Sequence, residues 1–152
     1  SRNGNNPRSG ERDDFPPNSA FPPYRILVVD DEPDIASIMK KGLERNGFQV
    51  VAFTNPVEAL SSFSRHQYDI VLTDIRMPQM NGLELFRRLR AIDNDVLICF
   101  VTAYEQFRQE FEITHPEEPV GCFIPKPVHV NNLAATIVRK MEERESGWRK
   151  KL

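Results

Sequence analysis

Short apolar runs alternate along the chain with segments in which apolar residues recur every three or four positions. The runs have the length of strands buried on both faces of a sheet; they cover residues 25–30, 50–53, 70–72, 96–101 and 120–124. The periodic segments predict amphipathic helices; they cover residues 35–43, 57–63, 83–89, 107–111 and 133–141. Strands and helices that alternate in this way form right-handed crossovers. The pattern therefore predicts an α/β fold, a doubly wound, mainly parallel five-stranded sheet with helices on both faces.

Residues 1–24 differ from the rest of the chain, because they are rich in Asn, Pro, Ser, Gly and charge and show no periodic apolar pattern. Such a segment cannot bury enough apolar surface to offset the entropy of ordering it. We expect a flexible N-terminal tail at 1–24, one folded domain over 25–146, and a C-terminal extension or linker stub at 147–152.

The composition fits one folded domain with its own core, since 39% of the 152 residues are hydrophobic. A formal net charge of -2 gives no basic field for a nucleic-acid backbone, so direct nucleic-acid binding is not expected. No apolar run approaches the ~18 residues that a membrane span requires, and no membrane association is expected.

The two cysteines, Cys99 and Cys122, both lie inside apolar runs. This placement favours two small core residues over a disulfide or a metal site. Such cysteine usage suits a reducing cytoplasm, which is the compartment we expect. The three histidines show no metal-ligand spacing, and we expect them to be structural or surface residues.

Asp74 directly follows the third apolar run and precedes a loop marked by Pro78 and by Asn81-Gly82. In open parallel sheets, ligands bind just outside the carboxyl ends of the strands. A carboxylate at that place is more often chemical than structural, although a lone solvated loop aspartate is also common.

Polar residues also follow three other predicted strands. Asp30 and Asp31 come after the first strand, Thr102 ends the fourth and Lys126 follows the fifth. Taken singly, each has an ordinary alternative, such as an acidic pair at a helix start or a solvated lysine. Because parallel strands end on the same rim, these residues should converge on Asp74.

Neighbouring carboxylates repel one another and raise one another's pKa unless a cation neutralises them, so the cluster favours a hard divalent ion such as Mg²⁺. We expect Asp31 and Asp74 to be direct ligands and Asp30 to act mainly through water. The backbone carbonyl of Arg76 would complete the protein's share of the ligands.

A cation at this place would allow the Asp74 carboxylate to attack an anionic phosphoryl donor. Asp74 would then be the nucleophile, and an aspartyl phosphate is an established type of covalent intermediate. The Lys126 ammonium would pair with one phosphoryl oxygen, and the Thr102 hydroxyl would donate a hydrogen bond to another.

The segment from about Arg25 to Glu145 resembles the receiver domain of two-component response regulators. The resemblance rests on an acidic-pair motif, a phosphorylation-site strand and loop, a switch-threonine motif and a lysine-proline motif: Val28–Pro33, Thr73–Pro78 with Asn81-Gly82, Val101–Ala103, and Lys126-Pro127. It implies the flavodoxin-like receiver fold, with strand order 2-1-3-4-5. It also implies that a sensor histidine kinase or a histidine phosphotransfer protein phosphorylates Asp74.

The resemblance further implies a conformational switch made by Thr102 and Phe123. Phosphorylation would draw the threonine hydroxyl inward, and the aromatic ring would fill the vacated space. The output would be a population shift in the surface of the fourth helix, fifth strand and fifth helix. That surface would contact a downstream effector or output domain, and a phosphorylation-linked homodimer is an open alternative.

Two features depart from the pattern of the family. Phe123 stands where a tyrosine is often found, and the segment 106–119 carries two prolines and lacks the usual small residues before the fifth strand. The sequence leaves open whether this is a stand-alone receiver or one excised from a longer chain.

Arg76, Ala103 and Tyr104 follow Asp74 and Thr102 and should flank the phosphoryl pocket. Arg76 and Tyr104 are bulky enough to obstruct an in-line water molecule, so we expect a slowly hydrolysing phosphoaspartate.

Two other functions remain open at this stage. A Mg²⁺-dependent phosphohydrolase with an aspartate nucleophile would normally carry a general acid two positions later, where Arg76 stands. A receiver-like interaction module that takes no phosphate would tolerate loss of the acidic pair, Thr102 or Lys126, all of which are present. We therefore expect a signalling receiver and not an enzyme, apart from its own phosphorylation and autodephosphorylation.

Overall fold

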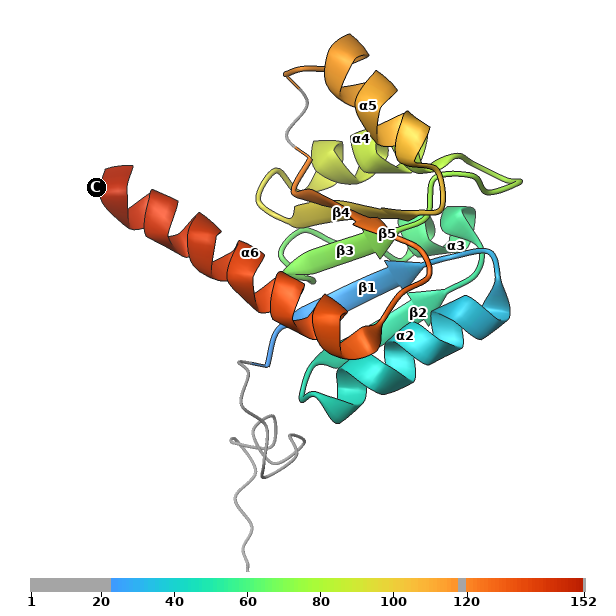
Figure 1. The fold of residues 1–152 in the computed structure, drawn as a ribbon, viewed down its shortest axis with the longest axis horizontal. Helices are drawn as coiled ribbons and strands as arrows, with labels where there is room; N and C mark the ends of the chain where they lie inside the picture. The colour runs from blue at the N-terminus through green and yellow to red at the C-terminus, as the bar shows by residue number, and fades with distance from the viewer. Residues whose placement is uncertain (1–22, 118–119, 152) are drawn as a thin grey trace, which may run out of the picture.

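The computed structural model describes residues 23–117 and 120–151. Five parallel strands form one sheet in the order β2-β1-β3-β4-β5 (Figure 1). The strands are β1 (Arg25–Val29), β2 (Gln49–Phe53), β3 (Ile70–Thr73), β4 (Leu97–Thr102) and β5 (Cys122–Pro125). This arrangement confirms the predicted fold class and strand order. Most of the predicted tail, residues 1–22, lies outside the described residues.

A helix precedes or follows each strand along the chain, as the apolar periodicity predicts. The helices are α2 (Pro33–Arg45), α3 (Pro56–Ser61), α4 (Gly82–Ile92), α5 (Glu105–Thr114) and α6 (Val130–Lys151). Asn55 and Asn81 start α3 and α4, because their side chains accept hydrogen bonds from free backbone N–H groups of the first turn. Gly47 follows the end of α2 with a φ of 98°, a conformation that glycine adopts without a steric penalty.

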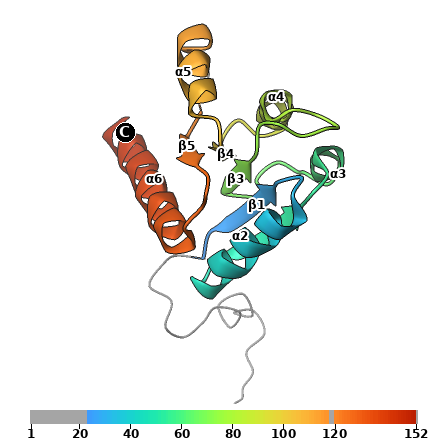
Figure 2. The ribbon, with the colours of Figure 1, turned by 45° about the vertical axis from the view of Figure 1, so that its right-hand side comes forward.

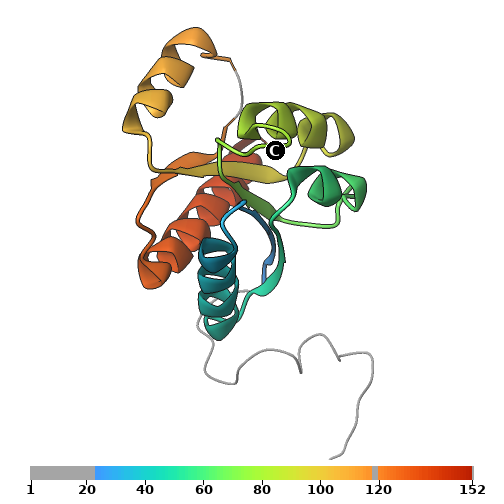
Figure 3. The same cartoon turned by 90° about the vertical axis from the view of Figure 1, so that its right-hand side faces the viewer.

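The helices cover both faces of the sheet (Figures 2 and 3). Buried apolar side chains form a separate core on each face. On one face α2 and α6 pack against side chains such as Ile26 and Leu72. On the other face α3 and α4 cover Leu27, Val71 and Phe100. Alternate residues of β1 and β3 thus point to opposite cores, so each strand is buried on both sides.

Helix α5 is attached to the second core mainly by aromatic rings. Phe111 is the buried residue of α5, and its ring centroid lies 5.8 Å from that of Phe100 on β4. Phe107 lies 5.9 Å from Phe100, and Phe123 of β5 lies 5.7 Å from Phe111. We call Phe100, Phe107, Phe111 and Phe123 the aromatic cluster. In the described part of the chain, the side-chain hydrogen bonds and ion pairs of α5 stay within the helix or reach the adjacent His115.

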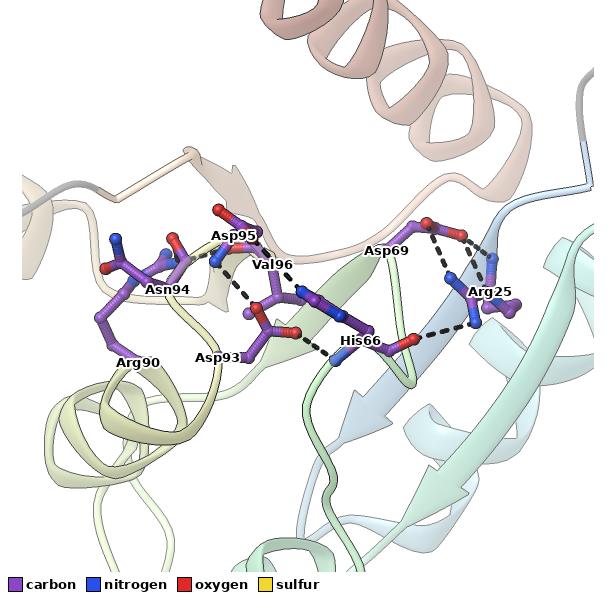
Figure 4. Close-up of polar contacts among 8 residues, drawn as sticks. All are labelled: Arg25, His66, Asp69, Arg90, Asp93, Asn94, Asp95 and Val96. Atoms are coloured by element: carbon purple, nitrogen blue, oxygen red, sulfur yellow. Dashed lines mark hydrogen bonds and ion pairs between the residues drawn. The ribbon is translucent and has the colours of Figure 1, made fainter.

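Hydrogen bonds tie together the loops at the amino ends of β1, β3 and β4 (Figure 4). The Asp93 carboxylate is 1% exposed and accepts bonds from the backbone N–H groups of His66, at 2.9 Å, and Asp95, at 2.8 Å. Arg25 is paired with Asp69 and also donates to the His66 carbonyl. These contacts use the backbone N–H and carbonyl of His66, while its side chain lies 3.4 Å from Asp95 Oδ2. Polar contacts thus fix this rim of the sheet.

The structure contradicts the expectation for the two cysteines. Cys99 and Cys122 occupy directly opposed positions of the neighbouring strands β4 and β5, with their Cα atoms 4.6 Å apart, and form a disulfide. They do lie in apolar surroundings, as expected, but as a bonded pair. The expectation of two separate core thiols is wrong, because it took no account of the register between β4 and β5.

Among the helices in residues 23–117 and 120–151, none combines the length and the apolar character needed to cross a membrane.

Removing the carboxylate that ties the loops should destabilise the fold. We expect Asp93→Ala to lower the free energy of unfolding by about 1–3 kcal/mol, because it leaves two backbone N–H groups without their acceptor. Urea denaturation measures the change. The matched control is Asp95→Ala, which removes only an exposed pair with His66 at 3.4 Å and should change stability by less than about 0.5 kcal/mol. Equal losses in the two variants would contradict this role of Asp93.

The same carboxylate should make stability depend on pH. Burial alone would raise the pKa of Asp93, but the backbone N–H groups of His66 and Asp95 outweigh it and hold the pKa below the usual value of 3.8. The stabilisation is therefore complete above that value and is lost as pH falls through the lower folded-state pKa. The stability advantage over Asp93→Asn should shrink as the pH falls below about 4. An advantage that stays constant as the pH is lowered would exclude this linkage.

Candidate functional site

The carboxyl ends of four parallel strands carry the polar residues that were expected at the site. The registers pair Val29 with Thr73 and Thr102 with Pro125. Asp74 continues the ladder one residue beyond β3, since its N–H donates to the Val29 carbonyl at 2.9 Å. Lys126 does the same beyond β5, since its N–H donates to the Thr102 carbonyl at 2.9 Å. The sheet itself thus aligns the residues that were expected to converge.

Three carboxylates form the acidic part of the site. One oxygen each of Asp30, Asp31 and Asp74 lies within 4.8 Å of the others. Asp30 is fully buried, Asp74 is buried and Asp31 is half-buried. Several carboxylate oxygens converging from two strand ends form a donor set that suits a hard cation such as Mg²⁺. The side chains present therefore fit the Mg²⁺ ion that the sequence pattern predicts.

Lys126 joins two of these carboxylates. Its Nζ lies 2.8 Å from Asp30 Oδ2 and 3.1 Å from Asp74 Oδ2, and the lysine side chain is only 13% exposed. Burial alone would lower the pKa of Lys126, but Asp30 and Asp74 outweigh it and raise the pKa above its usual value. Burial raises the pKa of Asp30, and the charge of Asp74 adds to the increase while Lys126 opposes it. A protonated lysine is thus held beside the acidic group.

Backbone contacts orient the Asp74 and Thr102 side chains. Asp74 Oδ1 accepts a hydrogen bond from the Ile75 N–H at 2.7 Å, while Oδ2 faces Lys126. The Thr102 hydroxyl oxygen accepts from the Tyr104 N–H at 3.0 Å. This bond uses an oxygen lone pair, so the hydroxyl hydrogen is left to donate.

The residues expected to flank the pocket include a stacked pair. The Arg76 guanidinium lies 4.1 Å from the centroid of the Tyr104 ring, a cation–π contact. Both residues are exposed, as is Ala103. The two bulky side chains come from the loops after β3 and β4, so their contact joins the loops that follow Asp74 and Thr102.

Phe123 lies on the face of the sheet that α4 and α5 cover. Its ring is half-buried and packs 5.6 Å from Phe100 and 5.7 Å from Phe111. Phe123 therefore connects β5 with the aromatic cluster that holds α5, three residues before Lys126 in the chain.

Sequence reasoning missed two contributors to the site. Glu32 Oε1 lies 3.6 Å from Lys126 Nζ, and the Glu32 N–H donates to Asp30 Oδ1 at 2.9 Å. Gly82 packs so closely that an added Cβ would lie 2.2 Å from the Asp74 carbonyl oxygen. The Asn81-Gly82 pattern indicates a helix start, but it contains no sign of that contact.

The family model for the response regulator receiver domain matches residues 26–138. Among curated proteins, the chain is 31% identical over 122 residues to the transcriptional regulatory protein PrrA of Mycobacterium bovis, covering 80% of this chain and 52% of PrrA. It is 32% identical to the response regulator receiver protein CpdR of Brucella abortus, covering 77% of this chain and 96% of CpdR. The chain thus spans about half the length of PrrA and nearly all of CpdR.

Solved structures show the same fold. The response regulator protein TrrA of Thermotoga maritima, solved in complex with Mg²⁺-BeF, is 31% identical with a TM-score of 0.66. The similarity covers 77% of this chain and 98% of TrrA.

A side chain at position 82 should disturb the loop that carries Asp74. We expect Gly82→Ala to lower the free energy of unfolding by about 1–3 kcal/mol, since the new methyl group would overlap a backbone oxygen that cannot move freely. Urea denaturation measures the loss. The control on the same helix is Arg88→Ala, which removes an exposed pair with Glu84 and should cost less than about 0.5 kcal/mol. A Gly82→Ala protein as stable as Arg88→Ala would contradict the close approach.

Proposed function

The chain belongs to the response regulator receiver family, and from that membership we propose that it accepts a phosphoryl group on Asp74. The observation that carries the proposal is the position of Lys126, whose ammonium contacts both Asp74 and Asp30. A carboxylate held beside a largely shielded lysine and two further acids has the groups needed to receive and stabilise a phosphoryl anion.

In the proposed reaction, a carboxylate oxygen of Asp74 attacks the phosphorus of the donor, and the bond between phosphorus and its carrier breaks. The product is an acyl phosphate on Asp74. Lys126 pairs with the transferred phosphoryl oxygens and offsets their charge. Asp30, Asp31, Asp74 and the Arg76 carbonyl would hold Mg²⁺, which neutralises the charge of the transferring group. TrrA, the relative solved with Mg²⁺-BeF, supports this choice of ion.

The same proposal assigns the conformational response to Thr102 and Phe123. The Thr102 hydroxyl can donate a hydrogen bond to a phosphoryl oxygen while it still accepts from Tyr104. A shift of Thr102 toward Asp74 changes the space available to the aromatic cluster, to which Phe123 belongs. The resulting population shift would reach the surface of α5, β5 and α6.

The proposed partners follow from family membership. A sensor histidine kinase or a histidine phosphotransfer protein supplies the phosphoryl group, and a downstream effector or output domain contacts the surface of α5, β5 and α6. PrrA, whose name describes a transcriptional regulator, is about twice as long as the matched segment. A phosphorylation-linked homodimer is a further candidate for the output.

Phosphorylation can be tested directly by intact mass. After incubation with Mg²⁺ and acetyl phosphate, we expect the mass to increase by one phosphoryl group. The gain should vanish in Asp74→Asn and in the presence of EDTA, because both remove a component that the reaction needs.

The other outcomes separate the competing functions. No adduct from acetyl phosphate or from any histidine kinase, in a folded protein, would favour an interaction module that takes no phosphate. Donor turnover without a lasting adduct would favour a phosphohydrolase. Asp69→Asn is the matched control, because Asp69 lies at the opposite rim and pairs with Arg25. It should be phosphorylated like the original chain.

The stacked pair Arg76 and Tyr104 should slow loss of the phosphoryl group. A cation–π contact at an exposed site contributes about 0.5–1 kcal/mol. The attacking water enters only when this contact opens, so losing the contact should lower the barrier by that amount and raise the hydrolysis rate about two- to fivefold. We expect this increase in Arg76→Ala and in Tyr104→Ala, measured from the decay of the phosphorylated mass after removal of the donor. Unchanged decay in both variants would contradict the idea that these two side chains obstruct the attacking water molecule. Arg87→Ala, an exposed change on α4, serves as the control.

A further inference from the structure

The disulfide between Cys99 and Cys122 joins two strands that lead directly to the functional site. Cys99 lies three residues before Thr102, and Cys122 is adjacent to Phe123. Their side chains belong to the core on the α6 side of the sheet, whereas Phe100 and Phe123 point to the opposite face. The sulfur bond thus fastens β4 to β5 from one face, and the aromatic cluster packs on the other.

The two cysteine residues differ in their exposure to solvent. Cys99 is 1% exposed on β4, an inner strand of the sheet. Cys122 is half-buried on the edge strand β5 and lines a groove of about 630 Å³ between α5 and α6. Arg108, Thr136 and Lys140 are also among the residues that line this groove. Cys122 is therefore the more accessible of the two residues, from the side of the groove, while Cys99 is shielded.

We propose that Cys99 and Cys122 form a thiol–disulfide exchange site, in which Cys122 reacts with low-molecular-weight thiols and disulfides and Cys99 is its buried partner. Oxidation begins when the Cys122 thiolate attacks a small disulfide, forming a mixed disulfide and releasing one small thiol. The Cys99 thiol, after losing its proton to solvent, then attacks Cys122 Sγ and releases the second small thiol. Reduction follows the reverse path, with two small thiols supplying the two electrons.

The structural setting favours reversible exchange over a permanent structural bond. The pair joins strands that already share a hydrogen-bonded ladder, so the fold does not need the sulfur bond for its topology. In any compartment that is kept reducing, a disulfide of this kind is usually transient and serves redox sensing. The bond would restrain β5, which carries Phe123, relative to β4. This exchange needs no phosphoryl transfer, so it can be tested without a phosphodonor.

The test compares Cys99→Ala with Cys122→Ala after reduction, removal of the reductant and exposure of the folded proteins to oxidised glutathione. Intact mass then reports the products. The original chain should lose two hydrogens and retain no glutathione, since Cys99 resolves the mixed disulfide. Cys99→Ala should keep one glutathionyl group on Cys122. Cys122→Ala should react about tenfold more slowly or not at all, because Cys99 is buried. In urea the two variants should react at similar rates.

A measurement on the original chain covers the case in which a variant fails to fold. The reduced protein is treated briefly with iodoacetamide and the two cysteines are mapped by peptide mass, with Cys122 expected to be labelled well before Cys99. Equal labelling of the two cysteines or earlier labelling of Cys99 would overturn the proposal. So would an oxidised original chain that keeps glutathione, or equal reaction rates of the two folded variants.

Discussion

The contact of one lysine with two aspartates is the constraint on which the site depends. Parallel strands end on the same rim, so the turns after β1 and β3 place Asp30 and Asp74 beside each other in a setting that is almost closed to solvent. Two such carboxylates repel each other unless positive charge lies between them. Lys126 supplies that charge from 52 residues further along the chain. Its position in turn requires β5 to pair with β4, because the bond from the Lys126 N–H to the Thr102 carbonyl extends that pairing.

Much of this arrangement follows from the sequence, because it depends on topology. Alternating strand and helix patterns predict a parallel sheet, and a parallel sheet places the residues after each strand at one rim. Asp30, Asp74, Thr102 and Lys126 could therefore be brought together without coordinates. The order β2-β1-β3-β4-β5 came from the family resemblance, since periodicity alone does not order the strands.

The features that sequence reasoning missed depend on register and on close approach. Cys99 and Cys122 are bonded because β4 and β5 pair at that register, and no local pattern reveals it. Gly82 faces the Asp74 carbonyl because the β3–α4 loop folds back on the strand end, a tertiary contact that an Asn-Gly pair does not encode. The hydrogen bond from the His66 N–H to the Asp93 carboxylate joins two loops that are 27 residues apart in sequence. Each loop by itself has the sequence of an ordinary polar connection, so neither predicts the bond.

Helix α5 is held by a different kind of contact from those at the rims of the sheet, and the two kinds of contact depend differently on temperature. Its attachment to the sheet relies on the rings of Phe107 and Phe111, whereas ion pairs and hydrogen bonds hold Asp74 and Asp93. Apolar contacts weaken on cooling, and their exposure raises the heat capacity. The packing of α5 on the sheet should therefore weaken on cooling. Its local detachment should have a positive heat-capacity change, because it exposes apolar rings.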